Sequence, residues 1–267
     1  MINECPYCNT DSGVIYRIQQ QTRQGRPRDI YRCKICDCVY PHPRMSQNEA
    51  IEYLCKLYEN VNELRYSNHL PSLRIINEIA KPHMRVLDIG AFCGEFCQTL
   101  KNSGLTVLGL EPLKEACAIA VESGINVFHG YLPDEIPFEI QGKLFEIITL
   151  NEVIYYFNNL YLCMTRIGEM LQEGGYLFIK CCQADSKYYD DLSHSYFEIY
   201  GDHVQAIPTM TSLYHMLEAQ GFEIVRFDWL FSPFKFSKRI RPGTLVDKVL
   251  ISLEDAANRI YSSRKPM

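Results

Sequence analysis

From residue 84 onward, short apolar runs alternate with longer stretches in which apolar residues recur every three or four positions. Six runs have strand length and several are rich in β-branched residues: 84–90, 105–112, 125–130, 144–153, 176–182 and 222–230. Four stretches have helical spacing and end at a glycine: 95–104, 113–124, 159–175 and 210–221. Repeated strand–helix–strand units place parallel strands side by side with helices on both faces. The pattern therefore predicts an α/β domain over 84–230 with a doubly wound, mostly parallel sheet.

A helical region is predicted to precede this domain. Ser46, followed by Glu49 three residues later, has the pattern of a capping box, and the apolar positions of 46–66 recur with helical spacing. A second helix is predicted over 71–80, between two prolines. We interpret residues 45–83 as a helical connector.

The last segment, 231–267, joins a basic stretch to an amphipathic pattern. Four cations lie among aromatic residues: Lys235, Lys238, Arg239 and Arg241. The apolar positions of 244–263 predict an amphipathic helix. Such a tail can make a peripheral membrane contact or grip a phosphorylated substrate. The alternative is a helix packed on the domain or on a second subunit, and the oligomeric state stays open.

Cysteines dominate the start of the chain. Two C-x-x-C pairs supply four thiols: Cys5, Cys8, Cys33 and Cys36. Each pair can place two thiolates about a tetrahedral ion, and such knuckles favour a left-handed residue just after the pair, here Asn9 and Asp37. Residues 1–44 therefore predict a zinc ribbon with a structural zinc ion. Cys38 is an alternative ligand in place of Cys36, or a buried thiol entering the last strand of the ribbon.

Composition narrows the class of protein. The chain has 267 residues, 47% hydrophobic and 22% charged, which is typical of a globular protein. It has no apolar run long enough to span a membrane and no signal peptide pattern, so we expect a cytoplasmic protein whose twelve cysteines are thiols or metal ligands. The net charge of −5 divides into +3 for residues 1–44 and −8 for the rest. A basic module can contact nucleic acid, but the acidic remainder makes a nucleic-acid partner the less favoured interpretation.

The ends of the predicted strands carry the candidate binding residues. In a sheet of this kind, ligands bind beyond the carboxyl ends of the strands. The residues at these ends are Asp88 and Gly90, Glu111, Gly130 and Tyr131, Asn151 and Glu152, and Cys182, Gln183 and Asp185. Glu111 lies 21 residues beyond Gly90, near the spacing at which an acid on the second strand accepts ribose hydroxyls. Gly90 and Gly94 allow the backbone to pass close to a ligand.

These motifs resemble those of class I S-adenosylmethionine-dependent methyltransferases, which have a Rossmann-like fold. The similar segments are "VLDIGAFCGEF", "LEP" and "LNEVIYYFNNLYLCMTRIGEMLQEGGYLFIK". The chain is most similar to the small-molecule branch that carries an N-terminal zinc ribbon, through "YRCKICDCVYPHPRMSQNEAIEYL" and "GDHVQAIPTMTSLYHMLEAQGFEIV". The resemblance covers about residues 1–228.

The resemblance implies roles for individual residues. Gly90 and Gly94 line the methionine end of S-adenosylmethionine, Glu111 the ribose, and Asn151 the sulfonium. The residues Tyr131 and Leu132 are neighbours of the adenine. The sequence departs from the pattern at three places: Phe92 replaces a middle glycine, Tyr131 replaces an acid, and Tyr155-Tyr156 replaces Glu-His. A middle glycine is required only where φ is positive or a Cβ would strike the ligand, so we expect Phe92 to be tolerated. A phenylalanine that points along the cleft could also cover the methionine moiety.

Methyl transfer requires the acceptor to be held in line with the methyl group, and a hydroxyl acceptor also requires a base. The segment 183–209 is predicted to roof the acceptor. His203 is the leading candidate base, His194 the alternative, and Glu152 either a base or a residue that orients Asn151. We expect methylation of oxygen or carbon of a small polar metabolite, a sugar or a secondary metabolite. The alternatives are an RNA methyltransferase whose ribbon grips RNA, and a non-catalytic binding protein with a degenerate loop.

Overall fold

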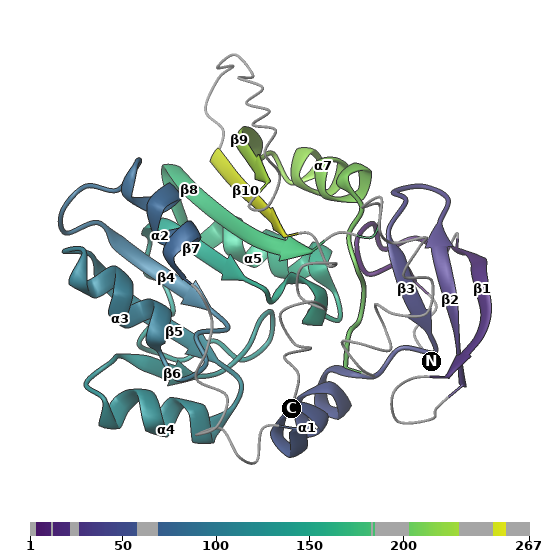
Figure 1. Cartoon of the computed structure of the whole chain (residues 1–267), viewed down its shortest axis with the longest axis horizontal. Helices are drawn as coiled ribbons and strands as arrows, with labels where there is room; N and C mark the ends of the chain where they lie inside the picture. Colours follow the sequence, from purple (N-terminus) through teal and green to yellow (C-terminus); the bar gives the residue numbers. More distant parts are fainter. Residues whose placement is uncertain are drawn as a thin grey trace, which may run out of the picture.

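A computed structural model of the chain describes residues 4–11, 13–21, 27–57, 69–182, 184, 203–229 and 248–254, and the statements below concern these residues. They form a small three-stranded sheet near the N-terminus, a seven-stranded sheet and helices that cover it (Figure 1). None of the described helices has the length and apolarity needed to cross a membrane.

The small sheet lies within the predicted zinc ribbon. Its antiparallel strands are β1 (Gly13–Gln21), β2 (Pro27–Cys33) and β3 (Val39–His42), in the order β1-β2-β3. In the connector, α1 (Gln47–Leu57) and α2 (Leu70–Asn77) fall within the two predicted helices. The capping box of α1 is present as predicted: the Ser46 hydroxyl and backbone N–H both donate to Glu49, and the Glu49 N–H donates back to the Ser46 hydroxyl at 3.3 Å.

The large sheet has the strand order β6-β5-β4-β7-β8-β10-β9, and its described strand pairs are all parallel. The strands are β4 (Arg85–Ile89), β5 (Thr106–Glu111), β6 (Val127–His129), β7 (Phe145–Asn151), β8 (Leu171–Cys182), β9 (Glu223–Trp229) and β10 (Lys248–Glu254). The helices that follow the strands are α3 (Glu95–Asn102), α4 (Lys114–Glu122), the short 3₁₀ helix η2 (Ile154–Tyr156), α5 (Leu160–Met170) and α7 (Met210–Ala219). The predicted doubly wound parallel fold is confirmed.

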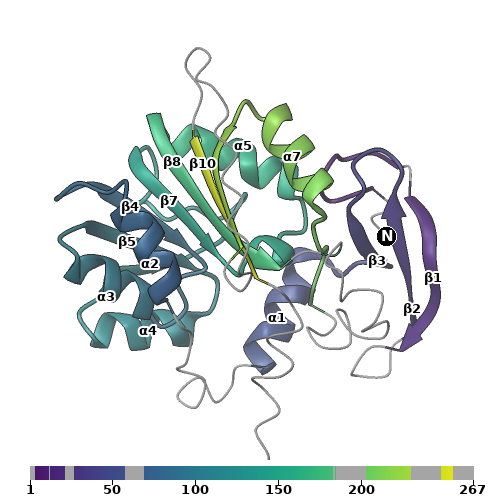
Figure 2. The same cartoon turned by 45° about the horizontal axis from the view of Figure 1, so that its top comes forward.

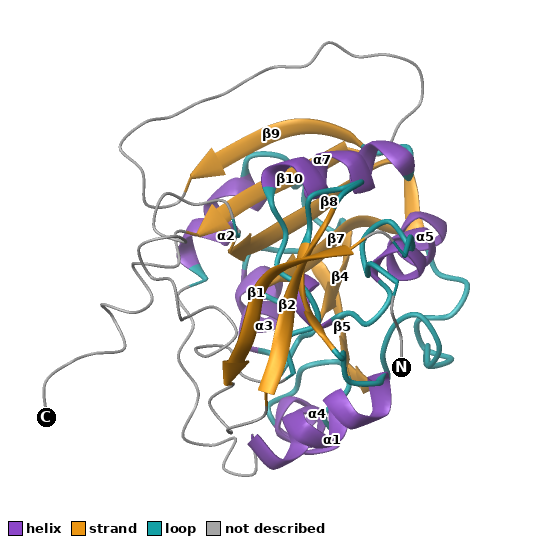
Figure 3. Cartoon of the chain, turned by 90° about the vertical axis from the view of Figure 1, so that its right-hand side faces the viewer, coloured by secondary structure: helices purple, strands orange, loops and turns teal. Residues whose placement is uncertain are grey.

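The side chains of the strands point alternately to the two faces of the sheet, and this divides the buried apolar residues into separate clusters. On β4, Leu87 and Ile89 pack in one buried cluster with residues of α5 and α7, whereas Val86 packs in a second cluster with residues of α2, α3 and α4. Because successive side chains of a strand point to opposite faces, helices cover both faces of the sheet. Figure 3 shows α5 and α2 on opposite sides of the strands.

Two predicted helices are corrected by the structure. The helix predicted over 159–175 ends at Met170, and the following residues belong to β8; Gly174 takes a positive φ of 73° where the pairing register with β7 shifts. The amphipathic helix predicted over 244–263 is wrong for Lys248–Glu254, which form β10 between β8 and β9. The short apolar run in this segment suits a buried strand as well as a helix, and periodicity alone does not separate the two.

The ribbon is joined to the large domain by backbone hydrogen bonds and by a common core. Val39 of β3 and Ile207 exchange two backbone hydrogen bonds, and the Pro6 carbonyl accepts the N–H of Leu160 at 3.0 Å. One hydrophobic cluster contains Tyr7 and Tyr40 of the ribbon together with core residues of the large sheet. Figure 2 shows the ribbon beside α7, with α1 between the two units.

Candidate active site and metal centre

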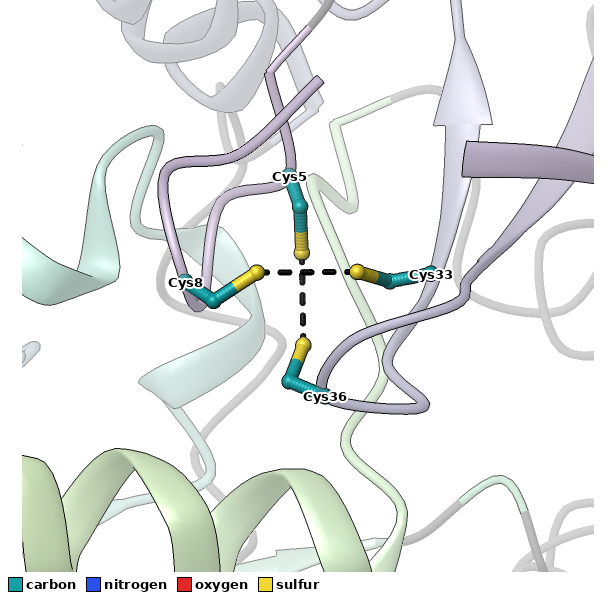
Figure 4. Close-up of side chains that lie close together, drawn as sticks. All are labelled: Cys5, Cys8, Cys33 and Cys36. Carbon is teal, nitrogen blue, oxygen red and sulfur yellow. Dashed lines mark hydrogen bonds between the residues drawn. The ribbon is translucent and has the colours of Figure 1, made fainter. Parts of the chain in front are cut away.

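The four predicted zinc ligands lie together. The Sγ atoms of Cys5 and Cys36 are 3.5 Å apart, as are those of Cys8 and Cys33, and all four lie within 4.8 Å of one another (Figure 4). A tetrahedral zinc ion with bonds of about 2.3 Å places its sulfur ligands about 3.8 Å apart. The geometry therefore fits a four-thiolate zinc ion, which is a closed, structural type of site.

The knuckle turns show why the sequence folds this way locally. Asn9 and Asp37 have φ values of 57° and 69°, the left-handed conformation that the sequence predicts for them. Their N–H groups donate to the carbonyls of Cys5 and Cys33 at 2.9 and 3.0 Å. Cys38 is buried outside the group of four sulfurs, and its thiol faces the Ile207 carbonyl at 3.8 Å. Cys36, and not Cys38, therefore belongs to the group of four thiols that could hold the ion.

The loop after β4 has the backbone that its glycines predict. Gly90 and Gly94 have φ values of 77° and 82°, and a Cβ at Gly90 would lie 2.3 Å from Val153 Cγ1. Phe92 also has a positive φ, of 50°. The middle position is therefore one that favours glycine, and Phe92 occupies it at a conformational cost of order 1 kcal/mol. The sequence argument named a positive φ as one condition under which glycine is required, and at Phe92 this condition is met.

Glu111, the predicted ribose ligand, closes β5 and faces this loop. Its carboxylate accepts the N–H of Phe92 at 2.8 Å and the N–H of Leu113 at 2.9 Å. Burial raises the pKa of Glu111 from 4.5 to about 7, and the two backbone donors oppose this shift. The carboxylate ties the loop to β5, and its remaining lone pairs can accept ribose hydroxyls.

Asp88 is buried at the end of β4 and joins neighbouring elements. It accepts a 2.6 Å hydrogen bond from the Thr149 hydroxyl of β7 and a 3.6 Å bond from the Cys97 thiol of α3. Burial raises its pKa to about 6, opposed first by the Thr149 bond. These contacts hold the strand ends beside the loop, and a direct contact of Asp88 with the cofactor stays a prediction.

The predicted adenine and sulfonium neighbours occupy the adjoining strand ends. Tyr131 and Glu135 exchange backbone hydrogen bonds of 2.8 and 2.9 Å, and Leu132 is buried. The Asn151 side-chain oxygen accepts a 3.0 Å hydrogen bond from Ser72 of α2. The structure thus brings Asn151 to the same sheet edge as Asp88 and Glu111, while the individual ligand contacts stay predictions.

Glu152 is held by two neighbours. Its carboxylate accepts a 2.6 Å hydrogen bond from the Tyr155 hydroxyl and lies 3.4 Å from the ammonium group of Lys180 on β8. Its backbone has a φ of 59°, and its N–H donates to the Lys180 carbonyl at 2.7 Å. The role of Glu152, either a base or a residue that orients Asn151, stays a prediction.

His203 lies in an aromatic stack. The residue is 4% exposed, and its ring stacks on Tyr53 of α1 and on Tyr156 of η2, with ring centroids 5.1 Å apart in each pair. The next residues are anchored to the same wall, because the Gln205 N–H donates to the Tyr155 carbonyl at 2.8 Å. His194, Gln183 and Asp185 lie outside the described residues.

Several residues of this edge were missed by sequence reasoning. His69, just before α2, stacks on Phe96 at 4.9 Å, and its pKa is lowered to about 4 by burial and then by the charge of Lys180. Lys180 is buried within β8. No local pattern marks either residue, because His69 precedes a helix of the connector and Lys180 lies inside an apolar strand. Tyr53 was likewise hidden among the polar positions of α1.

The comparisons with known proteins agree with this geometry. A family model described as "Methyltransferase domain" matches residues 63–226, more than half of the chain, so the chain belongs to this family. With the parallel sheet, the loop after β4 and the acid ending β5, the class is that of S-adenosylmethionine-dependent methyltransferases with a class I fold. This confirms the predicted class.

Individual relatives cover part of the chain. It is 31% identical over 106 residues to a ubiquinone biosynthesis O-methyltransferase of Chelativorans sp. (38% of this chain, 42% of the relative), and 31% identical over 99 residues to the protein of that name from Agrobacterium fabrum (36% and 39%). The match thus spans less than half of these relatives. A solved S-adenosylmethionine-dependent methyltransferase of Thermotoga maritima, described as a possible histamine N-methyltransferase, has a TM-score of 0.52 at 19% identity, covering 66% of this chain and 81% of that one, which shows the fold alone.

Proposed function

We propose that the protein transfers a methyl group from S-adenosylmethionine to an oxygen or carbon atom of a small polar metabolite, a sugar or a secondary metabolite. The observation that carries the proposal is the aromatic wall around His203, formed by Tyr53, Tyr156 and the adjoining Tyr155. A buried histidine among tyrosine rings suits a compact acceptor ring with hydroxyl groups, which stacks on aromatic side chains and donates to polar ones. The names of the partial relatives support transfer to oxygen.

The donor site lies along the carboxyl ends of β4, β5 and β7. When bound, S-adenosylmethionine supplies an electrophilic methyl group on a positively charged sulfur. Gly90 and Gly94 give the loop a backbone that passes close to the ligand, and Glu111 offers a carboxylate for the ribose hydroxyls. Asn151, oriented by the Ser72 hydroxyl, stands at the neighbouring strand end.

The acceptor site follows from the residues beyond β7. Tyr53 and Tyr156 hold the His203 ring between them, so the orientation of the imidazole is fixed before an acceptor arrives. His203 takes the proton of an acceptor hydroxyl as the base, and His194 is the alternative. Glu152 keeps the loop after β7 in its left-handed turn through Lys180 and Tyr155.

The zinc centre supports this arrangement from outside the reaction. With four thiolate ligands it leaves no coordination position for a substrate, so its role is to hold the ribbon. Backbone bonds between Val39 and Ile207 then fix the segment that follows His203. This role accounts for the ribbon without an RNA partner, and no contact among the described residues favours the RNA alternative.

The experiment has two stages. Calorimetry with S-adenosylhomocysteine tests donor binding, and absence of binding in folded, zinc-loaded protein would contradict the proposal. Radiolabelled methyl transfer is then measured on a panel of phenols, catechols, free sugars and sugar nucleotides, with unmodified transfer and ribosomal RNA as the opposing arm. Transfer to RNA and to none of the small molecules would replace the proposed acceptor class with the alternative.

A further inference from the structure

Two adjacent residues of α1 face two different parts of the site. Leu54 is buried in a cluster with Cys93, Leu113 and Ala116, and Phe92 packs against this cluster from the loop after β4. Tyr53 stacks on His203, with the ring planes inclined by only 19°. One turn of α1 therefore contacts the donor loop through Leu54 and the acceptor wall through Tyr53.

The backbone strain at Phe92 bears on what its side chain contributes to the contact with α1. A phenylalanine with φ of 50° is less stable than glycine at the same position, because its Cβ crowds the backbone in the left-handed region. Replacing it by glycine would relieve that strain and remove only the side chain. We infer that an interaction of the side chain offsets the strain. The described interaction is its packing against the cluster that contains Leu54.

The capping box of α1 does not provide this docking. The Ser46–Glu49 capping box lies within α1 and its first turn, so it determines where the helix begins and not what the helix rests on. Of the α1 side chains that the structure describes, Ala50 and Leu54 are the buried apolar ones, and Leu54 is the larger. The seat of α1 on the domain thus depends on the cluster around Leu54.

We propose that Phe92 is a positioning residue that docks α1 on the donor loop, and that α1 thereby holds Tyr53 on His203 as part of the acceptor site. This inference rests on the proposed function and goes beyond it, because it couples the two halves of the site. Binding of the donor fixes the loop that carries Phe92, which strengthens the docking of α1 and orders the acceptor wall. The donor therefore binds first and prepares the site for the acceptor.

The test uses amide hydrogen exchange of the full-length, zinc-loaded protein with and without S-adenosylhomocysteine. In the wild type, the ligand slows exchange in both 47–57 and 203–209. In Phe92→Gly, exchange of both segments is at least about fivefold faster and the slowing by ligand is lost, because the helix opens from its seat. Phe92→Leu restores an apolar side chain and recovers protection, while Tyr53→Ala loosens 203–209 and leaves the donor loop unchanged.

Each outcome discriminates. Faster exchange of both 47–57 and 203–209 in Phe92→Gly, with recovery in Phe92→Leu, is the result expected of coupling through α1. Exchange that changes only in the loop 89–95, or equal protection by ligand in wild type and Phe92→Gly, overturns the inference while leaving the proposed function intact. Calorimetry on the same samples separates the two, because loss of S-adenosylhomocysteine binding by the wild type would contradict the proposed function itself.

Discussion

The affinity of the donor site for S-adenosylhomocysteine is expected to rise with pH, because of Glu111. The carboxyl is buried, and burial raises its pKa from 4.5 to about 7 in the free protein. Ribose hydroxyls donate hydrogen bonds to the ionised carboxylate, so binding favours ionisation and releases a proton from the fraction of molecules in which Glu111 is protonated.

The size of the effect follows from the pKa. At pH 8 about nine-tenths of the free molecules are ionised at Glu111, whereas at pH 6 only about one-tenth are. The affinity therefore falls between pH 8 and pH 6, by about fivefold if the neutral form binds ten times more weakly and by at most about tenfold, or about 1.4 kcal/mol, if only the ionised form binds. Stability of the free protein changes in the opposite direction. Since the folded pKa lies above the unfolded value, Glu111 adds stability at low pH that is lost as pH rises from 4.5 to about 7.

The assay is calorimetry at several pH values, in buffers of different ionisation enthalpy so that proton release is counted directly. Glu111→Gln should bind about tenfold more weakly at pH 8 and show no pH dependence in this range, because it keeps the shape and loses the charge. Glu115→Gln, on the exposed side of α4, is the matched control and should retain the wild-type profile. An affinity that is flat from pH 6 to 8, or the same slope in Glu111→Gln, would show that this carboxylate does not bind the ribose.

Three further outcomes are expected. First, elemental analysis of the purified protein should give one zinc ion per chain, and Cys33→Ser should lower both the zinc content and the Tm, the latter by more than about 5 °C. Cys55→Ser, which changes an exposed thiol outside the cluster, is the control and should retain both. Equal zinc content in the two variants would contradict the site. Second, Glu152→Gln leaves the charge of Lys180 buried without its partner carboxylate and should lower the free energy of unfolding in urea by about 3 kcal/mol. The double variant with Lys180→Met should recover at least half of this loss. No recovery would show that the ion pair is not the cause. His203→Ala lowers turnover on an acceptor found in the screen by about 10²–10⁴-fold with donor affinity unchanged, and full activity would remove it as the base.

Much of the fold could be predicted from periodicity. The alternation of strands and helices predicts the elements of the large domain along the chain up to β9, and the Ser46–Glu49 spacing predicts the start of α1. Local patterns failed where a short apolar run suited two structures. Lys248–Glu254 becomes a strand because the sheet offers a place between β8 and β9, and a pairing partner far away in the sequence is not visible in the run itself.

The candidate site, like the fold, could be predicted in part from the sequence. The cysteine spacing, with Asn9 and Asp37 behind each pair, predicts the metal centre almost completely because the geometry of a knuckle is local. The strand-end rule brings Glu111 and Asn151 to one edge because parallel strands end at the same edge of the sheet. It could not show that His69 approaches Lys180, since that contact joins elements more than a hundred residues apart. The left-handed backbone at Phe92 was hidden because an aromatic residue is a poor indicator of positive φ.

The common core of ribbon and sheet has a consequence for the life of the protein in a cell. Units that share one core and are tied by the Val39–Ile207 bonds gain and lose their structure together. We expect a chain without zinc to lack the ion that holds one side of that core, and therefore to be cleaved faster by proteases than the zinc-loaded protein. We therefore expect occupancy of the metal site, which has no open position for a substrate, to determine the stability of the large sheet as well as that of the ribbon.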